Sequence, residues 1–587
     1  MPQMRWGERW WGSALLLLSA CPRDPPLDVV EAPAKVRAEA IGLHAAGGYV
    51  GSTPCAECHE ATHASWHRSF HRTMTQRPNP QSVLGRFDGA ALDDKGRYRA
   101  TRRGDRFLVT QPQMDGGVRE QEVELVTGSH HMQVYWVRGA RETLEAFAFA
   151  YLLPEQRWVP NESTLLRPPA AHDARRGEAI EAVYTWNRVC VKCHAVDGAP
   201  GFDVAEGDVQ TTVAELGIAC EACHGPGAAH VAAWKNREPA SAQLPQDDPT
   251  ILDPRERGAA AASEVCAQCH SISVFHDDPA WVAHGRDAPP PAPVSDWGRV
   301  VRHPLREHGD WTDALLDADP DFFAQRYWSD GEVRVSGREF NGQLDSPCAV
   351  SKDFGCTSCH RMHESELRVD GQAWNDGQLK EGAADGAACG RCHEDIAAAP
   401  AAHSKHGGVS GPSCLDCHMP RTTYGLLGAI RSHTVTSPSV EATRTTGRPL
   451  ACNLCHLDRT LAWSAVALER DFGLACSPEV CAIDCSEPSV EAGEIGCVPA
   501  VAEWLLAGDA GQRALAAWHL GWAPAHAVAS APWAEVLLDG LVERDPYPAV
   551  RLVAERARRA LGTSGPEPTW AAAVRSRRDD REVRLAE

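Results

Sequence analysis

The sequence predicts a mainly α-helical fold with a small β-meander near its start and a helical segment near its end. Three observations lead to this prediction. One short cysteine and histidine pattern recurs along most of the chain, alternating segments stand in one gap between its repeats, and helical periodicity replaces it after about residue 498. The chain has 587 residues, enough for several domains, but only 7% of them are aromatic. Such a chain needs something besides bulky side chains to pack around.

Composition excludes two classes of protein. With 58 Lys and Arg against 79 Asp and Glu, the net charge is −21, which argues against a nucleic-acid-binding protein, because these carry a basic face. With 43% hydrophobic residues and 19 Trp, a largely disordered chain is also excluded.

The recurring pattern is C-x-x-C-H, which occurs eight times, whereas composition alone would give roughly 0.04 occurrences. We number the motifs 1 to 8 in chain order. They consist of Cys55, Cys58 and His59; Cys190, Cys193 and His194; Cys220, Cys223 and His224; Cys266, Cys269 and His270; Cys356, Cys359 and His360; Cys389, Cys392 and His393; Cys414, Cys417 and His418; and Cys452, Cys455 and His456.

This spacing is typical of covalent c-type haem attachment. The two thiols bond the vinyl groups of one porphyrin, and the adjacent histidine becomes the proximal ligand of the iron. Zinc also binds paired C-x-x-C units, but it does not need a histidine after every second cysteine. A thioredoxin-like dithiol needs one motif and a βαβ context. The sequence therefore predicts eight covalently bound c-type haems.

The first 21 residues predict an exported lipoprotein. Arg5 and Arg9 precede a short apolar run at 14–18, and Leu18-Ser19-Ala20-Cys21 resembles a bacterial lipobox. We expect cleavage before Cys21 and a lipid anchor on it, which places the protein at a membrane in the periplasm or on the cell surface. An ordinary signal peptide is the alternative. Residues 22–48, rich in Pro and Ala, are predicted to be a tether.

Six cysteines lie outside the motifs, and they are Cys21, Cys348, Cys476, Cys481, Cys485 and Cys497. The last four crowd into a connector at 461–497, where two disulfides are expected in an oxidising compartment. A small metal site is the alternative for these four, and Cys348 has no assignment.

The motif-bearing region spans about 49–460. The gap between motifs 1 and 2 contains alternating segments at 106–110 and 122–126 with Gly116-Gly117 between them, which predict the β-meander. A second gap, 271–355, is rich in Pro and Asp and predicts an extended loop with short helices.

Residues 498–587 form a predicted helical segment. Helical patterns cover 500–506, 512–520, 533–542 and 548–561, and the stretch 545–554 resembles a HEAT-type repeat. The alternative is an ordinary helical tail packed on the rest of the protein.

Several motifs carry further residues that resemble a known family. These are Tyr49-Val50-Gly51-Ser52 before motif 1, with Trp66, Ser69, His71 and Met74 after it; Gly225-Pro226-Gly227 and His230 after motif 3; and Met419-Pro420 with Arg431-Ser432-His433-Thr434 after motif 7. Over about 49–460 the chain resembles multihaem cytochromes of the superfamily that contains pentahaem nitrite reductase and octahaem hydroxylamine oxidoreductase. The resemblance implies a mostly helical fold built around stacked haems.

The chain departs from the catalytic members of that superfamily. The nitrite reductases have one C-x-x-C-K motif, whereas all eight motifs here end in His. Hydroxylamine oxidoreductase couples a tyrosine to its catalytic haem, and none of the eight tyrosines here stands in a matching context. The resemblance thus supports the scaffold more strongly than a particular reaction.

Eighteen further histidines are available as second ligands of the irons. The resemblance favours His71, His230, His363 and His433. The next candidates are one of His130 and His131, for which we select His131, and one of His403 and His406, for which we select His406. One of His303 and His308 follows. Met74, Met132, Met362 and Met419 are alternatives. The four favoured histidines and one from each of the three alternatives supply seven second ligands, one fewer than the eight irons need.

Two histidines per iron suit electron transfer, whereas an open iron can bind substrate. The leading hypothesis is therefore an electron carrier between a membrane donor and periplasmic or extracellular redox partners. The second is an oxidoreductase that acts on nitrite, hydroxylamine or tetrathionate at one five-coordinate haem. The third is a scaffold protein that binds partners through its helical segment.

Overall fold

The computed structural model describes residues 40–113, 116–139, 142–167, 185–203, 207–235, 248–364, 371–407, 411–475, 496–561 and 566–578, with positions 29–30, 478, 583 and 585. The predicted signal peptide with Cys21, and Cys476, Cys481 and Cys485, lie outside the described residues. Packed structure begins before the predicted start at residue 49, because Ile41 is fully buried and β2 (Gly42–Leu43) pairs with β15 (Thr212–Val213).

A ten-stranded, mainly antiparallel sheet fills most of the gap between motifs 1 and 2. Its central path runs in the order β11-β10-β8-β7-β6-β5-β4, and β1, β3 and β9 pair beside it. The strands are β1 (Val29–Val30), β3 (Thr75–Gln76), β4 (Asp88–Ala91), β5 (Arg99–Arg103), β6 (Arg106–Pro112), β7 (Val118–Thr127), β8 (Met132–Arg138), β9 (Leu144–Ala146), β10 (Phe149–Leu152) and β11 (Arg157–Pro160).

The predicted meander is the centre of this sheet. The segments at 106–110 and 122–126 lie in β6 and β7, which pair with Leu108 opposite Glu122. One face covers a core that contains Phe107, Val123, Tyr135 and Phe147. The fold is therefore mixed, mostly helical with a substantial antiparallel sheet, rather than helical with a small insertion.

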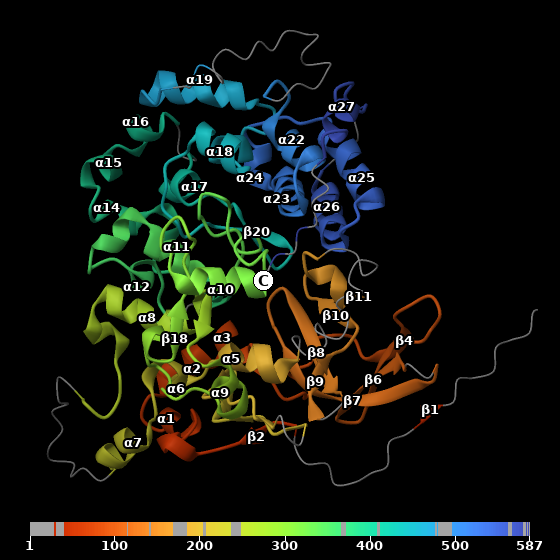
Figure 1. Cartoon of the computed structure of the whole chain (residues 1–587), viewed down its shortest axis with the longest axis vertical. Coiled ribbons are helices and arrows are strands. Elements are labelled where there is room, and N and C mark those ends of the chain that lie inside the picture. Colours follow the sequence, from red (N-terminus) through yellow and green to blue (C-terminus); the bar gives the residue numbers. More distant parts are fainter. Residues whose placement is uncertain are drawn as a thin grey trace, which may run out of the picture.

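The motif-bearing region consists of short helices joined by loops and two-stranded ribbons. The helices are α1 (Thr53–Ala56), α2 (Glu60–His67), α3 (Phe70–Thr73), α5 (Val191–His194), α6 (Cys220–His224), α7 (Ala228–Lys235), α8 (Ala259–His270), α9 (Asp278–His284), α10 (Asp310–Ala318), α11 (Glu339–Asp345), α12 (Cys356–Cys359), α13 (Gly371–Gly377), α14 (Ala387–Gly390), α15 (Glu394–Ala398), α16 (Pro400–Ser404), α17 (Cys414–His418), α18 (Val440–Thr446) and α19 (Leu461–Phe472). In Figure 1 the motifs follow one side of the molecule, from α1 and α6 at the bottom past α8 and α12 to α14 and α17. The gap at 271–355 holds short helices, as expected, and also a ribbon of β17 (Ser273–Phe275) and β18 (Gly298–Val300).

The helices expected near the end of the chain are confirmed. They are α22 (Ala500–Ala507), α23 (Ala510–Leu520), α25 (Ala534–Arg544) and α26 (Pro548–Ala560), with the shorter α24 (Ala523–His526) and α27 (Ala571–Arg575). Helix α22 packs on α23, α23 on α26, and α26 on α25. The likeness to a HEAT repeat stays a prediction.

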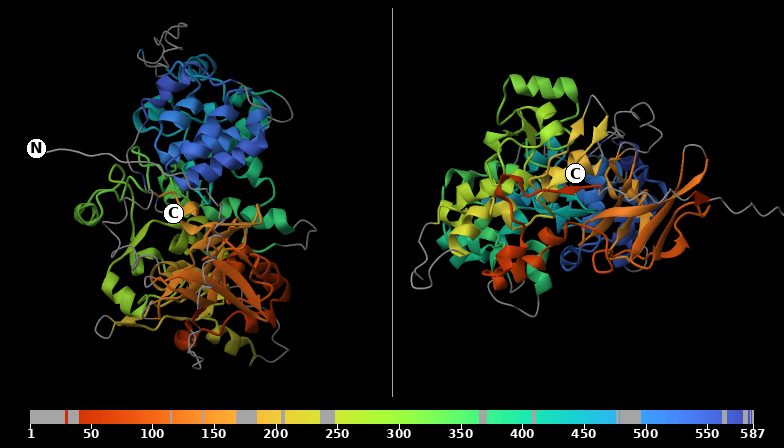
Figure 2. Two further views of the ribbon diagram at one scale, coloured as in Figure 1. Left: turned by 90° about the vertical axis from the view of Figure 1, so that its right-hand side faces the viewer. Right: turned by 90° about the horizontal axis from the view of Figure 1, so that it is seen from below.

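These helices share one apolar core with the motif-bearing region. This core includes Val335 and Leu454 from the motif-bearing region and Leu505 and Val553 from the helices. Figure 2 shows the helices (blue) stacked above the sheet (orange). At the contact, Arg157 Nη2 of β11 donates to Glu555 Oε2 of α26 at 2.6 Å. Among the described residues, no helix is long and apolar enough to cross a membrane.

Candidate functional site

The motifs fold into similar short helical turns. In motifs 1, 5, 6 and 8 the histidine N–H donates to the carbonyl oxygen of the first cysteine, at 2.8, 2.9, 3.0 and 2.8 Å. Residues three and four positions apart lie on one face of such a turn. The two thiols and the imidazole of each motif can therefore address one flat ligand.

Five motif histidines stand opposite a second histidine, with the two ring planes at 19° to 32° to each other. The ring centres are 6.2 Å apart in His59–His230, 6.3 Å in His224–His363, 6.3 Å in His360–His433, 6.0 Å in His418–His403 and 6.1 Å in His456–His406. The interplanar angles are 20°, 20°, 19°, 20° and 32° in the same order. A sixth pair, His270 and His71, has its centres 6.5 Å apart and its planes at 74°.

These separations fit two imidazoles on opposite sides of one metal ion. A bond from metal to imidazole nitrogen is about 2 Å, and the ring centre lies about 1 Å further out, so opposed rings have centres about 6 Å apart. In the described part of the chain, no group of three or more His, Cys, Asp or Glu side chains converges as a metal site. The separation of the rings fits an iron held between two imidazoles with a porphyrin between them.

The second ring nitrogen supports the same assignment. In seven of the paired histidines, Nδ1–H donates to an oxygen. The contacts are His224 to Leu252 O (2.7 Å), His230 to Asp248 Oδ2 (2.8 Å), His270 to Glu339 Oε2 (2.7 Å), His360 to Gly377 O (2.9 Å), His406 to Ser404 O (2.6 Å), His418 to Thr436 O (2.9 Å) and His433 to Arg431 O (3.2 Å). Such contacts fix the tautomer and leave Nε2 with its lone pair, as in metal-binding histidines.

Burial keeps two of the second ligands neutral. It lowers the pKa of His71 and of His363 to about 4. Both imidazoles are therefore uncharged at neutral pH, which ligation of an iron requires.

The second ligands come from segments that belong to other motifs. His71 follows motif 1 but faces His270 of motif 4, and His230 follows motif 3 but faces His59 of motif 1. The structure thus brings the predicted His71, His230, His363, His406 and His433 opposite motif histidines. It also uses His403, which the sequence offered only as the alternative to His406.

The structure does not bring the predicted His131 opposite a motif histidine. Its ring stacks on His130, with the centres 3.9 Å apart, and His130 in turn stacks on Phe70 and lies 3.3 Å from Asp376. His303 packs against Phe323 and Tyr327 instead of a motif.

Two motif histidines have no partner ring within the described ranges. His194 of motif 2 contacts Thr75 Oγ1 through Nδ1 at 3.2 Å, and His393 of motif 6 is exposed.

Thiols of different motifs approach one another in a continuous series. Cysteine side chains of different motifs lie next to each other in three pairs: Cys55 and Cys220, Cys193 and Cys269, and Cys266 and Cys356.

Four further pairs of motif cysteines lie near each other and extend the series: Cys223 and Cys266, Cys359 and Cys389, Cys389 and Cys414, and Cys417 and Cys452. The motifs therefore follow each other in space as 1, 3, 4, 5, 6, 7 and 8, and motif 2 joins at motif 4.

Two of the remaining cysteines can be placed. Cys348 is a free thiol that interacts with Cys392 of motif 6, and Cys497 is disulfide-bonded. The disulfide agrees with the pairing expected for this group of cysteines.

The eight motif turns and the opposed histidines define a multihaem c-type cytochrome. Residues 163–225, which include motifs 2 and 3, match the family described as Cytochrome c554 and c-prime. No curated protein matches the sequence.

Two solved structures are similar to this chain. The outer cell wall cytochrome OcwA is 15% identical with a TM-score of 0.46, over 87% of this chain and 99% of that chain. The octaheme sulfite reductase MccA of Wolinella succinogenes is 13% identical with a TM-score of 0.27, over 70% of this chain and 60% of that chain.

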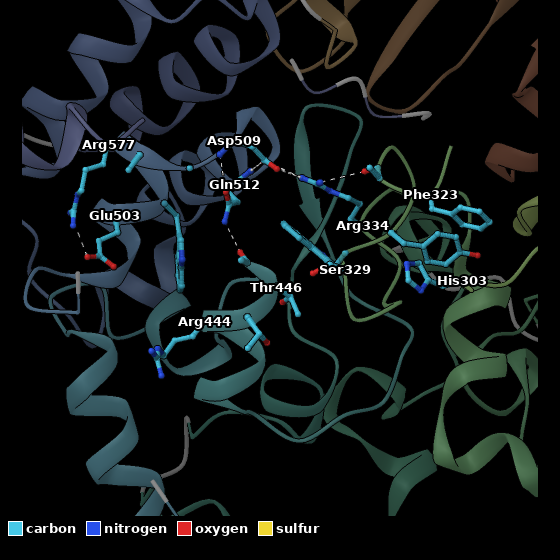
Figure 3. A pocket seen from close by; sticks show the side chains of 18 residues that line it. His303, Phe323, Ser329, Arg334, Arg444, Thr446, Glu503, Asp509, Gln512 and Arg577 are labelled. Atoms are coloured by element: carbon cyan, nitrogen blue, oxygen red, sulfur yellow. Dashed lines mark hydrogen bonds and ion pairs between the residues drawn. The ribbon is translucent and has the colours of Figure 1, made fainter. Parts of the chain in front are cut away.

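A cavity of about 730 Å³ lies away from the motifs, between α18, α22 and the segment around Trp328. Figure 3 shows Arg334 reaching Asp509 at one wall, while Glu503 lies near Arg577 at another. No motif residue lines this cavity.

Glu503 should make stability depend on pH. Burial raises the pKa of Glu503 from 4.5 to about 7, although Arg577 lies 3.8 Å away. Between these two pH values the unfolded chain releases the proton that the folded protein still holds, so stability falls as the pH rises from 4.5 to about 7. Glu503→Gln should therefore stabilise the protein by roughly 2 kcal/mol above pH ~8 and have little effect below pH ~4.5.

Thermal unfolding followed by circular dichroism at both pH values measures this difference. Glu567→Gln, at a half-exposed pair with Arg575, is the control and should change little at either pH. Equal stabilisation of the Glu503 variant at both pH values would contradict the assignment.

Proposed function

We propose that the protein is an electron-transfer cytochrome with eight covalently attached c-type haems. The observation that carries the proposal is the set of six opposed histidine pairs. A haem between two imidazoles supplies reversible one-electron transfer. Two histidines on one iron leave no position for a substrate, which favours an electron carrier over an enzyme at these six motifs.

The protein's own groups hold each ligand in place. Carbonyl and carboxylate oxygens bind Nδ1–H and so fix the rotation of each ring. The attachment cysteines of neighbouring motifs lie close together from motif 1 to motif 8, so haems attached to them would also lie close together. The path therefore needs no moving part.

The proposed partners are other redox proteins. The net charge of −21 favours a donor or acceptor with a basic docking face. The lipobox sequence at 18–21 supports a lipid anchor on Cys21 and a location outside the cytoplasm.

Removal of motif 6 tests the path, because this motif joins motif 5 to motif 7. A ruthenium photoreductant is attached to a cysteine introduced at exposed Glu60, next to motif 1, in a Cys348→Ser background. Under illumination with a sacrificial donor, all haems of the parent protein should be reduced in one phase. In Cys389→Ala/Cys392→Ala, the haems of motifs 1 to 5 should be reduced in that phase and those of motifs 7 and 8 much later.

The matched control is Cys452→Ala/Cys455→Ala, which shortens the series at its end and should leave one phase. Intact mass should show eight haems and a lipid on the parent protein, and seven haems on each variant. Single-phase reduction after loss of motif 6 would refute the path.

A second function is supported by motif 2. His194 and His393 have no imidazole opposite them within the described residues, and His194 is the less exposed of the two, so the motif 2 haem is the candidate site for a small nitrogen or sulfur compound. A high-spin signal in the parent protein, together with turnover of nitrite, hydroxylamine or tetrathionate, would favour this function.

A further inference from the structure

The Nδ1 partners of the paired histidines fall into two chemical classes. Most are backbone carbonyl oxygens, but His230 and His270 donate to carboxylates, Asp248 and Glu339. A carboxylate draws the Nδ1 proton more strongly than a carbonyl does, so the ring becomes more electron-rich at Nε2. A more basic ligand stabilises ferric iron and lowers the reduction potential.

The two carboxylates are not equally free to act on their histidine. Asp248 Oδ2 also accepts from Trp234 Nε1 at 2.7 Å, and its Oδ1 accepts from Thr250. Glu339 Oε2 accepts from His270 Nδ1 at 2.7 Å, and its Oε1 accepts from the Gly337 N–H at 2.8 Å. More of the charge of Glu339 is therefore directed at its histidine.

Glu339 also acts at the branch point of the thiol series. Cys269 of motif 4 lies next to Cys193 of motif 2, Cys266 lies next to Cys356 of motif 5, and Cys223 of motif 3 is also near Cys266. Helix α11, which begins with Glu339, packs on α8, which ends with His270. One carboxylate thus faces the ligand of the motif that meets three others.

We propose that Glu339 is a positioning residue that holds the motif 4 haem at a lower reduction potential than the haems whose histidines donate to carbonyls. The proposal rests on the proposed electron-transfer function, and it adds an uphill step at the branch. Electrons then reside on the haems of the neighbouring motifs 2, 3 and 5 rather than on the motif 4 haem at the branch.

The geometry gives this haem its own spectroscopic signature. The planes of His71 and His270 lie at 74°, whereas the other five pairs lie between 19° and 32°. Imidazoles with nearly parallel planes split the two iron dπ orbitals that overlap with the π systems of the rings, and crossed planes leave these orbitals close in energy. The motif 4 haem should therefore give the most anisotropic low-spin EPR signal of the protein.

The test is Glu339→Gln in the full-length holoprotein, titrated potentiometrically and followed by EPR. Glutamine can still accept the Nδ1 proton through its amide oxygen but carries no charge. The midpoint potential of the strongly anisotropic signal should shift to a higher value, while the other low-spin signals keep theirs. Glu339→Asp, which keeps the charge, should shift it less.

Asp248→Asn is the matched control, because it removes the carboxylate behind His230 and should affect only a signal of the coplanar type. An unchanged potential in Glu339→Gln would overturn the proposal. Conversion of the anisotropic signal to the coplanar type would also overturn it, because the potential would then depend on the orientation of the ring rather than on the charge of Glu339. The midpoint potential and the EPR signal of the motif 4 haem do not depend on electron transfer along the path. Failure of this proposal can therefore be distinguished from failure of the proposed electron-transfer path.

Discussion

Replacement of Asp545 by alanine should lower the free energy of unfolding of the C-terminal helices by about 3 to 5 kcal/mol. Asp545 Oδ2 accepts from Arg513 Nε at 2.7 Å, and both side chains are buried, with 0% and 2% exposed. Asp545 Oδ1 also accepts from the Tyr547 N–H at 2.9 Å at the start of α26. The variant leaves the guanidinium of Arg513 charged and without this partner inside a core.

Urea unfolding followed by helix circular dichroism measures the effect. Two residues earlier, Glu543 pairs with Arg544 at the surface, where the side chains are 67% and 65% exposed. Glu543→Ala is the matched control and should cost less than about 0.5 kcal/mol. Similar losses in the two variants would show that the buried pair is not important for stability. Asp545→Asn gives a milder test if the alanine variant does not fold.

Replacement of His433 by alanine should convert one haem from low-spin to high-spin. His433 faces His360 of motif 5 with the ring centres 6.3 Å apart, so its loss opens one side of that iron. Both thioether bonds of motif 5 remain, and the haem should stay attached. The opened iron should bind cyanide in the ferric state and carbon monoxide in the ferrous state.

EPR and ligand titration of the purified variant measure this change. His230→Ala should have the same effect at motif 1, because His230 faces His59. His276→Ala is the control, because this exposed ring contacts Ser295 O at 3.2 Å rather than a motif histidine. Unchanged spectra and no cyanide binding in the His433 and His230 variants would remove these ligand assignments.

The motif turns were predictable because their chemistry is local. Two thiols and one imidazole within five residues identify an attachment site whatever the surrounding fold. Helices α22, α23, α25 and α26 were predictable for a similar reason, since their apolar periodicity is visible in the sequence.

The pairing of histidines depends on the tertiary fold and could not be predicted. The sequence offered His403 and His406 as alternatives because they are close neighbours, yet α16 and the loop after it place them on two different motifs. Glu339 gave no signal at all, because only the packing of α11 on α8 brings it to His270.

The size of the sheet was underestimated for a related reason. Strand β7 alternates between more and less buried residues, which the sequence shows as alternating polarity. All four residues of β10 are buried, because this strand is covered on both faces. Such a strand has no alternation to detect.

The contact between β11 and α26 has a consequence for the order in which the molecule is assembled. Arg157 and Glu555 are 398 positions apart, and all motifs except motif 1 lie between them in the sequence. A chain that is synthesised from its N-terminus cannot form this contact until motif 8 has already emerged. Haem-attachment enzymes can therefore reach every C-x-x-C-H segment before the contact between β11 and α26 can form. We expect this contact to form after the haems have been attached.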